Sequence, residues 1–368
     1  LDSIPDVSAN LAVNLPNAAR AAELLGQPLS TFGLSPKAAP ALKSNVTASI
    51  KGSNITAKLR ELTASLETAK ISGDADFALQ NSVPNVSTNL AINLPDAART
   101  AALLGQPLST FGLSPKAAPA LKSNVTASLN GSNITAKLRQ LSASMAGANV
   151  TGSLDVALAG GAPNVSGNIA ANVPSTANLM TALGQSAPDL PQGFGRAIKA
   201  KTNLSFKSNQ LNLSGLTVSL DQNTLSGGVS VGLGGNVPNI NANLQAGDLD
   251  FSALSPDDNG TASSSSAGSG WPKDRIDASA LGLLNGNIKL KARSIDLGTL
   301  KLGATDLGVA IDRARAVVSI NDLRAYKGRF GGQLVANNRN GLSVAGDLRA
   351  NSVAIGSLMN DLVDFAMT

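Results

Sequence analysis

A long internal repeat is the feature of this sequence that most constrains its fold. The segment Pro5-Asp-Val-Ser-Ala-Asn-Leu returns as Pro84-Asn-Val-Ser-Thr-Asn-Leu and as Pro163-Asn-Val-Ser-Gly-Asn-Ile, each time 79 residues later, and a fourth start stands at Pro238. Residues 24–49 recur without change at residues 103–128. Because units repeated at such a period stack on their neighbours, we expect an array of similar units.

Each unit contains segments in which apolar and polar side chains alternate. In residues 7–15 the odd positions hold Val, Ala, Leu, Val and Leu, and the even positions hold Ser, Asn, Ala and Asn. A period of two places the two sets on opposite faces of a β-strand. The same alternation predicts strands at residues 46–50, 55–59, 62–66 and 71–79, separated by short polar turns.

One segment of each unit has helical character instead. Residues 16–26 begin with Pro16, continue through Ala, Glu and Leu, and end at Gly26, which suits a left-handed C-cap. Residues 95–105 and 174–184 repeat this pattern. A unit is therefore predicted to comprise one strand, one short helix and about four more strands, joined as an antiparallel meander.

These patterns predict five segments in a chain that is predominantly β. Three β-repeats are expected at residues 1–81 (repeat 1), 82–160 (repeat 2) and 161–254 (repeat 3). The Ser- and Gly-rich residues 255–270 are predicted to be a flexible linker. Strands resume in a C-terminal β domain at residues 271–368, which we expect to be incomplete.

Composition argues against most classes of enzyme. The 368 residues include no His and no Cys, which removes Ser-His-Asp and Cys-His nucleophiles and most zinc, haem and iron–sulfur ligation. Aromatic residues make up 3%, and the formal net charge is only +5, so neither base-stacking platforms nor a phosphate-binding stripe is expected. The sequence therefore predicts no catalytic residue, no metal, no cofactor and no nucleic-acid partner.

The apolar strand faces have two interpretations. They can fill a closed sandwich or solenoid core, as in a structural or adhesive repeat protein. They can instead face an open groove that shelters an apolar ligand such as an acyl chain. The alternation alone fits both interpretations. The candidates for lining an open groove are Val7, Leu11, Val13, Leu15, Val86, Leu90, Ile92, Leu94, Val165, Ile169 and Val173.

Three lysines recur at the repeat period, namely Lys43, Lys122 and Lys201. They are candidates for contacts with phosphate head groups at the rim of a groove. The simpler interpretation is that they are solvated lysines that discourage edge-to-edge pairing of strands.

The C-terminal part resembles the C-terminal domain of the AsmA family. The resemblance rests on residues 271–281 (WPKDRIDASAL), on Leu284-Asn285, on residues 294–303 and on residues 323–332 (LRAYKGRFGG). Lys327, between Tyr326 and Gly328, departs from the family's Tyr-Gly-Gly. The Leu-Leu-Gly helix before strands in residues 1–254 is more loosely similar to the family's central portion.

The resemblance implies a periplasmic protein of Gram-negative bacteria, anchored in the inner membrane and linked to outer-membrane biogenesis. It also implies kinship with bridge-like lipid transfer proteins, and so favours the open interpretation: an elongated, repeating antiparallel β-sheet groove, taco- or solenoid-like, with one short helix per repeat. The expected function is then non-enzymatic conduction of phospholipid acyl chains between the inner and outer membranes, with other envelope proteins as further partners. The sequence begins at Leu1 and has no window of 18 apolar residues, so we expect the transmembrane anchor to lie outside it.

Overall fold

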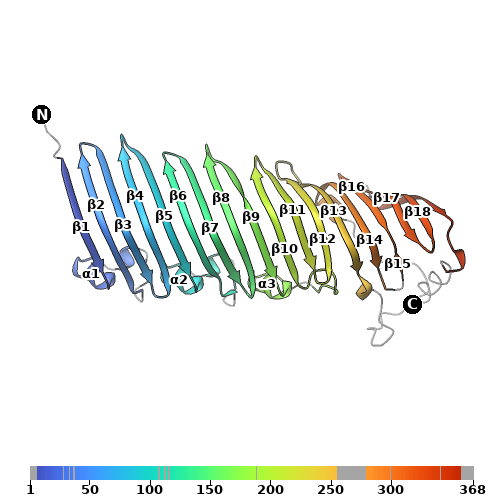
Figure 1. Ribbon diagram of the computed structural model, residues 1–368, viewed down its shortest axis with the longest axis horizontal. Coiled ribbons are helices and arrows are strands. Elements are labelled where there is room, and N and C mark those ends of the chain that lie inside the picture. Colours follow the sequence, from blue (N-terminus) through green and yellow to red (C-terminus); the bar gives the residue numbers. More distant parts are fainter. Residues whose placement is uncertain are drawn as a thin grey trace. The chain divides into compact units, whose positions relative to one another are not determined.

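The computed structural model describes residues 6–27, 29–32, 34–35, 38–106, 108–111, 113–114, 117–187, 189–254, 279–298, 300–339 and 341–357 (Figure 1). The chain divides into two compact units. Unit 1 comprises Leu1–Asp189 and Ala197–Ser208, and unit 2 comprises Leu190–Arg196 and Asn209–Thr368. The division falls inside the predicted repeat 3, while the predicted linker lies outside the described residues. The predicted domain limits stay predictions.

Unit 1 is a ten-stranded sheet in which each strand pairs antiparallel with the next one along the chain. Its outermost strands do not pair with each other within the described residues, so the sheet is not closed. The prediction of a mostly β, repeating antiparallel sheet is thus confirmed. The strands are β1 (Val7–Leu15), β2 (Pro40–Lys51), β3 (Asn54–Leu66), β4 (Ala69–Gln80), β5 (Val83–Leu94), β6 (Ala120–Asn130), β7 (Asn133–Met145), β8 (Ala148–Ala159), β9 (Ala162–Val173) and β10 (Ile198–Lys207).

One short helix follows the first strand of each repeat, as predicted. The helices are α1 (Ala18–Leu24), α2 (Ala97–Leu103) and α3 (Thr176–Ala182). Each begins after a residue whose side-chain oxygen accepts a backbone N–H of the first turn, and such a cap stabilises a helix too short to persist alone. The caps are Asn17, Asp96 and Ser175.

Repeats 1 and 2 each contain one strand fewer than predicted. The strands expected at residues 55–59 and 62–66 are two halves of β3, interrupted by a β-bulge at Glu61, where φ is +52°. The extra residue keeps Leu59 and Leu62 on the same face although they are three positions apart. Gln140 repeats the bulge in β7. The prediction of four strands after the helix was wrong because the alternation changes phase at a bulge and not at a turn.

A glycine lies across from each of these bulges. Gly73 in β4 has a φ of +141°, and a Cβ there would lie 2.0 Å from the carbonyl oxygen of Asn89 in β5. Gly152 in β8 has the same role, because its Cβ would lie 2.1 Å from the carbonyl oxygen of Asn168. The backbones approach too closely at both places for any residue but glycine.

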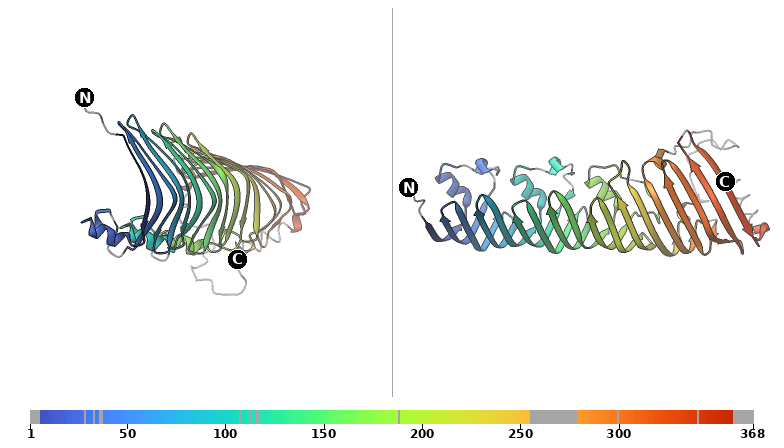
Figure 2. Two further views of the ribbon diagram at one scale, coloured as in Figure 1. Left: turned by 60° about the vertical axis from the view of Figure 1, so that its left-hand side comes forward. Right: turned by 90° about the horizontal axis from the view of Figure 1, so that it is seen from above.

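The strands of unit 1 are bowed, and the three helices lie on the concave side, at one end of the strands (Figure 2). Each of the second and third helices contacts the loop that follows the helix of the preceding repeat. The Ser35 N–H donates to the carbonyl oxygen of Leu103 at 2.7 Å, and the Ser114 N–H donates to that of Ala182 at 2.9 Å. Neighbouring repeats are therefore joined at the helices as well as through the sheet.

Unit 2 continues the β architecture with nine described strands. Their pairings are antiparallel except that β13 pairs with β14 in parallel. The order is β11-β12-β13-β14-β16-β17-β18-β19, with β15 also paired to β14. These strands are β11 (Gln210–Leu220), β12 (Asn223–Gly232), β13 (Asn239–Asp250), β14 (Asn285–Asp296), β15 (Lys301–Leu302), β16 (Thr305–Asp312), β17 (Arg315–Ala325), β18 (Gly328–Asn337) and β19 (Ser343–Asn351).

Unit 2 contains a small core and a fully buried amide. Leu249, Ala292 and Ile295 form the core. The Asn223 side chain is fully buried, and it donates to the carbonyl oxygens of Gly193 at 3.0 Å and of Asp250 at 2.8 Å. Its own oxygen accepts the Asp250 N–H at 2.6 Å. Because every polar atom of this amide is paired, the burial carries no unsatisfied group.

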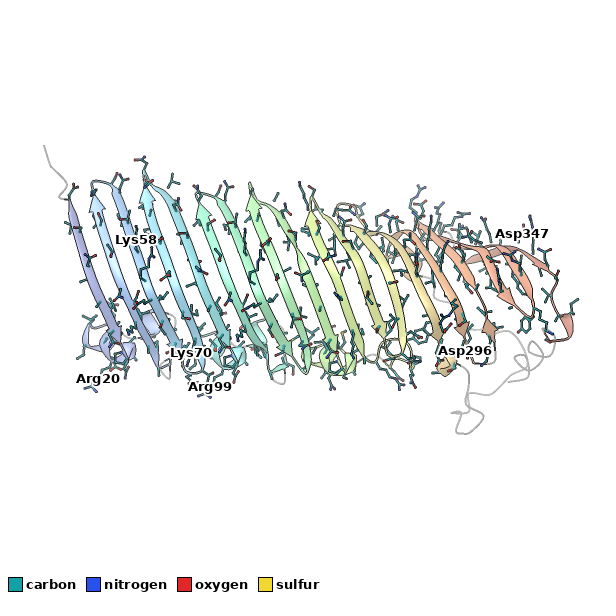
Figure 3. The ribbon with its side chains drawn as sticks, viewed as in Figure 1. Arg20, Lys58, Lys70, Arg99, Asp296 and Asp347 are labelled. Carbon is teal, nitrogen blue, oxygen red and sulfur yellow. The ribbon has the colours of Figure 1, made fainter. Side chains whose placement is uncertain are left out.

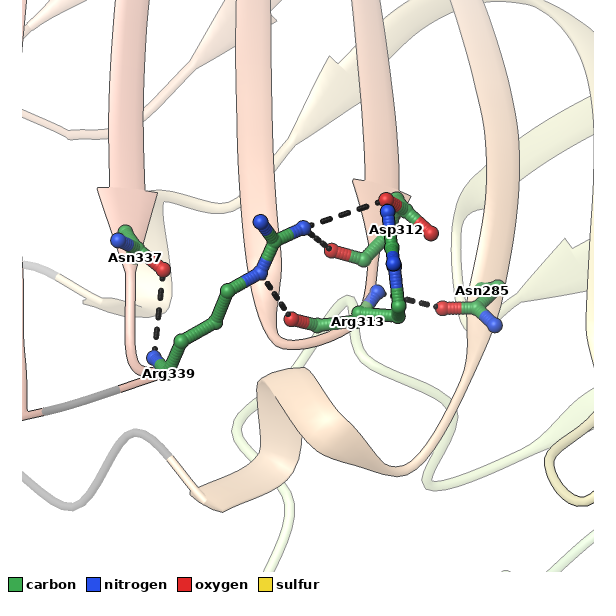
Figure 4. Close-up of polar contacts among 5 residues, drawn as sticks. All are labelled: Asn285, Asp312, Arg313, Asn337 and Arg339. Atoms are coloured by element: carbon green, nitrogen blue, oxygen red, sulfur yellow. Dashed lines mark hydrogen bonds and ion pairs between the residues drawn. The ribbon is translucent and has the colours of Figure 1, made fainter.

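An arginine holds the turn between β16 and β17 (Figure 4). The Arg339 guanidinium donates to the carbonyl oxygens of Arg313 at 2.9 Å and of Asp312 at 3.1 Å, and it also pairs with the Asp312 carboxylate. The Arg313 N–H donates to the Asn285 side chain at 2.8 Å. These contacts give the cluster a structural role, which is to hold the β16–β17 turn in place.

Candidate functional site

The apolar side chains of unit 1 share one face of the sheet. Residues paired across antiparallel strands project to the same face, so the register can be followed from strand to strand. One such row crosses all ten strands and, apart from one threonine, contains only apolar side chains. It consists of Leu11, Val46, Leu59, Ala75, Thr88, Ala127, Ala136, Val156, Val165 and Phe206.

This apolar face is largely uncovered. Leu11 is 57% exposed and Phe77 is 37% exposed, although both have apolar neighbours on the same face. Within the described ranges no second sheet packs over it, and the three helices cover only one end of the strands (Figure 2). Exposed apolar surface that continues from strand to strand is typical of a surface that binds a ligand, a partner or a membrane.

Helices α1 and α2 enclose part of the face in an apolar pocket of about 830 Å³. Alanines on the inner side of α1 let the helix lie close to the strands, while leucines extend the pocket wall. Its volume falls within the roughly 300–1,000 Å³ common for small-molecule sites. The lining residues are Leu15, Ala18, Ala21, Ala22, Leu25, Gln27, Leu34, Pro40, Ala41, Leu42, Ala64, Ser65, Leu66, Ala69, Ile71, Leu94, Thr100 and Leu104.

All eleven predicted lining residues lie on the apolar face, at corresponding positions of β1, β5 and β9. Two of them, Leu15 and Leu94, line the pocket. Val7 and Leu11, on the outermost strand, are more than half exposed. The others are half-buried: Val13 and Leu15 in β1, Val86, Leu90, Ile92 and Leu94 in β5, and Val165, Ile169 and Val173 in β9.

The pocket itself was not predicted. Its helical wall comes from Ala18, Ala21, Ala22 and Leu25, which have the i, i+3, i+4, i+7 spacing of one helix face. That spacing could have identified the inner face of the helix from sequence. Which strands lie beneath it depends on the register between repeats, which the sequence does not reveal.

The recurring lysines lie on the opposite face. Lys43 pairs with Asn14 and Thr63, whereas its neighbour Leu42 pairs with Leu15 on the apolar side. Lys122 and Lys201 occupy the same polar face at the corresponding places in β6 and β10. The register thus separates these lysines from the apolar lining, and their contact with head groups stays a prediction.

Three hydroxyl groups are buried among the apolar side chains at equivalent positions. Ser44 Oγ donates to the carbonyl oxygen of Arg60 at 3.2 Å, and Ser123 Oγ donates to that of Arg139 at 3.2 Å. Thr202 Oγ1 donates to the carbonyl oxygen of Asn203 at 3.1 Å. Since their protons are engaged by backbone carbonyls, these hydroxyls serve the strand geometry and not a ligand.

Every carboxyl group with a shifted pKa among the described residues has its pKa lowered. Arg293 and Ser294 donate hydrogen bonds to Asp248 and lower its pKa, and Arg329 does the same for Asp322. A general acid would need a raised pKa instead. No group of three or more Asp or Glu that could hold a metal occurs in the described ranges.

No protein-family model, no curated protein and no solved structure matches the chain. In the part of the chain that the structure describes, no helix is both long and apolar enough to cross a membrane.

Proposed function

We propose that unit 1 binds the acyl chains of phospholipids on its apolar face, as a non-enzymatic lipid-conducting protein. The observation that carries this proposal is the apolar surface that continues across ten strands without a covering layer. The pocket under α1 and α2 offers a place where a chain is enclosed on several sides.

The binding would come from burial of apolar surface. Each buried CH₂ group contributes about 0.8 kcal/mol, and no directional bond is needed. Side chains on this face are mostly aliphatic, and the hydroxyls of Ser44, Ser123 and Thr202 are engaged by the backbone, so the face supplies few polar contacts to distinguish lipids. We therefore expect weak selectivity among acyl chains, which suits movement along a face more than tight storage.

The alternative, a structural or adhesive repeat protein with a closed core, needs a second layer over this face. In unit 1 the described residues supply only three seven-residue helices, at one end of the strands, and two four-residue 3₁₀ helices, Leu29–Phe32 and Leu108–Phe111. A protein of that kind would also leave the apolar pocket without a role.

The cellular setting of the proposal rests on the resemblance to the AsmA family. On that basis we place the protein in the periplasm of a Gram-negative bacterium, anchored to the inner membrane by a segment outside this sequence. Its role would be phospholipid movement between inner and outer membranes during outer-membrane biogenesis, together with other envelope proteins.

Site-specific photo-crosslinking in a Gram-negative periplasm tests the proposal. A benzoyl-phenylalanine probe replaces Leu42, which lines the pocket, or the adjacent Lys43, which faces the other way. Leu121 and Lys122 provide the same pair in repeat 2. Mass spectrometry should find phospholipid adducts at both leucines and not at the lysines. Adducts to protein alone at the leucines would contradict lipid binding and favour the closed structural alternative.

A further inference from the structure

The three helices of unit 1 are equivalent in the repeat, but one has no neighbour. Leu103 in α2 is 8% exposed and Ala182 in α3 is 2% exposed, because each contacts the loop of the preceding repeat. Leu24 holds the same position in α1 and is 81% exposed. The described residues contain no loop that could cover it.

In the part of the chain that the structure describes, β1, the strand that precedes α1, also lacks a neighbour that its equivalent β5 has. β1 and β5 have the sequences VSANLAVNL and VSTNLAINL over their shared positions. β5 pairs with β4 on one edge and β6 on the other, whereas β1 pairs only with β2 among the described strands. Consequently Val7 and Leu11 are mostly exposed, while the matching Val86 and Leu90 are half-buried.

Among the described residues, an arginine of α1 also lacks the partner that its equivalent in α2 has. Arg99 in α2 forms a bidentate ion pair with Glu67, which lies in the β3–β4 turn of the preceding repeat. Its Nη2 lies 2.9 Å from Glu67 Oε1. Arg20 is the equivalent residue of α1 and lies at the same end of the strands (Figure 3). No carboxylate pairs with it within the described residues.

We propose that the outer edge of β1 together with Arg20 and Leu24 is a docking surface for one further repeat of the same kind. That repeat would present an antiparallel strand like β4, counterparts of Leu34 and Ala38 against Leu24, and a carboxylate like Glu67 against Arg20. A second copy of this chain does not supply these groups together, because both edges of β4 and of β8 are already paired. The proposal does not depend on lipid binding.

The surface is tested by adding one repeat beside β1. A copy of residues 4–82 inserted before Ile4 keeps the repeat period and places a β4-like strand next to β1. The chain has no cysteine, so Leu24→Cys introduces a single thiol whose reaction with a maleimide reports exposure. We expect the labelling rate to fall by about tenfold or more in the extended chain, because a buried thiol reacts only through local opening. Leu283→Cys, exposed in unit 2, should react equally in both chains.

Amide exchange with an added peptide, and sedimentation, test the docking surface further. If the extended chain does not fold, judged by amide exchange in β5, the synthetic peptide of residues 69–80 is added to the unmodified chain. Amide exchange in β1 should then slow with this peptide and not with a scrambled one. An unchanged labelling rate for Leu24→Cys in a folded extended chain, or unprotected β1 amides with peptide in excess, would overturn the proposal. Slow labelling of Leu24→Cys without the inserted repeat, in a chain that sediments as a dimer, would overturn it in favour of self-association.

Discussion

Repeats 1 and 2 share the same sequence over residues 24–49 and 103–128, yet their helices have different surroundings. Leu103 packs with Ala38 and Leu34 from the loop of repeat 1, whereas Leu24 has no such loop beside it among the described residues. Both helices are capped in the same way, by Asn17 and by Asp96. The local sequence therefore determines that a helix forms, and the preceding repeat determines whether the helix is buried.

This difference implies that stability is shared between neighbours. In repeat arrays the free energy of unfolding is approximately a sum of the terms of each repeat and of each interface between repeats. In unit 1 each interface combines a strand pairing, β4 with β5 or β8 with β9, with the helix contact at α2 or α3. Substitutions at the helix contacts therefore test how much an interface contributes to the free energy of unfolding.

The largest predicted effect comes from a charge at the buried helix position. Leu103→Asp removes a buried leucine and places an unpaired carboxylate against Ala38, so the free energy of unfolding should fall by roughly 3 kcal/mol or more. Leu24→Asp is the matched change at the exposed position and should stay within about 0.5 kcal/mol. Urea denaturation monitored by circular dichroism measures both. Equal effects would mean that α2 is not held by the loop of repeat 1.

The next prediction concerns a place where the two repeats should behave alike. Gly73→Ala and Gly152→Ala each put a Cβ about 2 Å from a backbone oxygen of the next strand, so each should lower the free energy of unfolding by roughly 1–3 kcal/mol. The bulges have neighbours on both sides in both repeats, unlike the helices. Gly234→Ala, where the added methyl meets open space, is the control. A large difference between the two variants in the same urea assay would contradict the equivalence of the bulges.

Much of the fold follows from the sequence because the signals are local. The alternation in residues 7–15 predicts a two-faced strand, and the sequence from Pro16 to Gly26 predicts the helix that follows it. The bulge at Glu61 was missed because it leaves no turn residue, and two short strands and one bulged strand give the same apolar pattern. The parallel pairing of β13 with β14 was missed because strand direction depends on a connection whose path has no periodic signal.

The candidate site also has one part that local sequence predicts and one part that it does not. The apolar face follows from alternation alone, which is why Val86 and Leu90 were identified together. The pocket needs the register that brings Leu94 and Leu104 of repeat 2 to Leu42 of repeat 1, and that information is not local. The unequal burial of Leu24 and Leu103 could not be predicted from the sequence that follows them, because residues 24–49 and 103–128 are identical.

A smaller effect is expected from an ion pair that repeats 1 and 2 share. Arg60 pairs with Asp76 at 2.6 Å and Arg139 with Asp155 at 2.5 Å, whereas repeat 3 has Ser214 and Ser230 at these positions. The pairs are nearly half exposed, so replacing Arg139 and Asp155 with serine should cost about 0.2–1 kcal/mol, less at high salt. A double-mutant cycle at two salt concentrations measures the coupling. A coupling that does not weaken with salt would contradict a solvent-exposed pair.

The smallest predicted effect is a pH dependence confined to the interface between repeats 1 and 2. The hydrogen bond from Arg99 lowers the pKa of Glu67 below its ordinary 4.5. A carboxyl whose pKa is lowered by folding adds stability above its unfolded pKa, and this stability is lost as the pH falls through the folded value. The unmodified chain should therefore be more stable than Glu67→Gln by a small margin. This margin should be constant between about pH 5 and pH 7, which lies above the pKa of an unperturbed Glu. It should shrink below pH 4.5.

The corresponding interface between repeats 2 and 3 supplies the control, because Ala146 and Asn178 stand where Glu67 and Arg99 do. Ala146→Gln should therefore give no pH-dependent difference from the unmodified chain. Thermal unfolding at several pH values compares the variants. A margin for Glu67→Gln that grows on acidification would mean that Arg99 does not hold this carboxylate, and that the helix contact and the β4–β5 pairing join repeat 1 to repeat 2 without the ion pair.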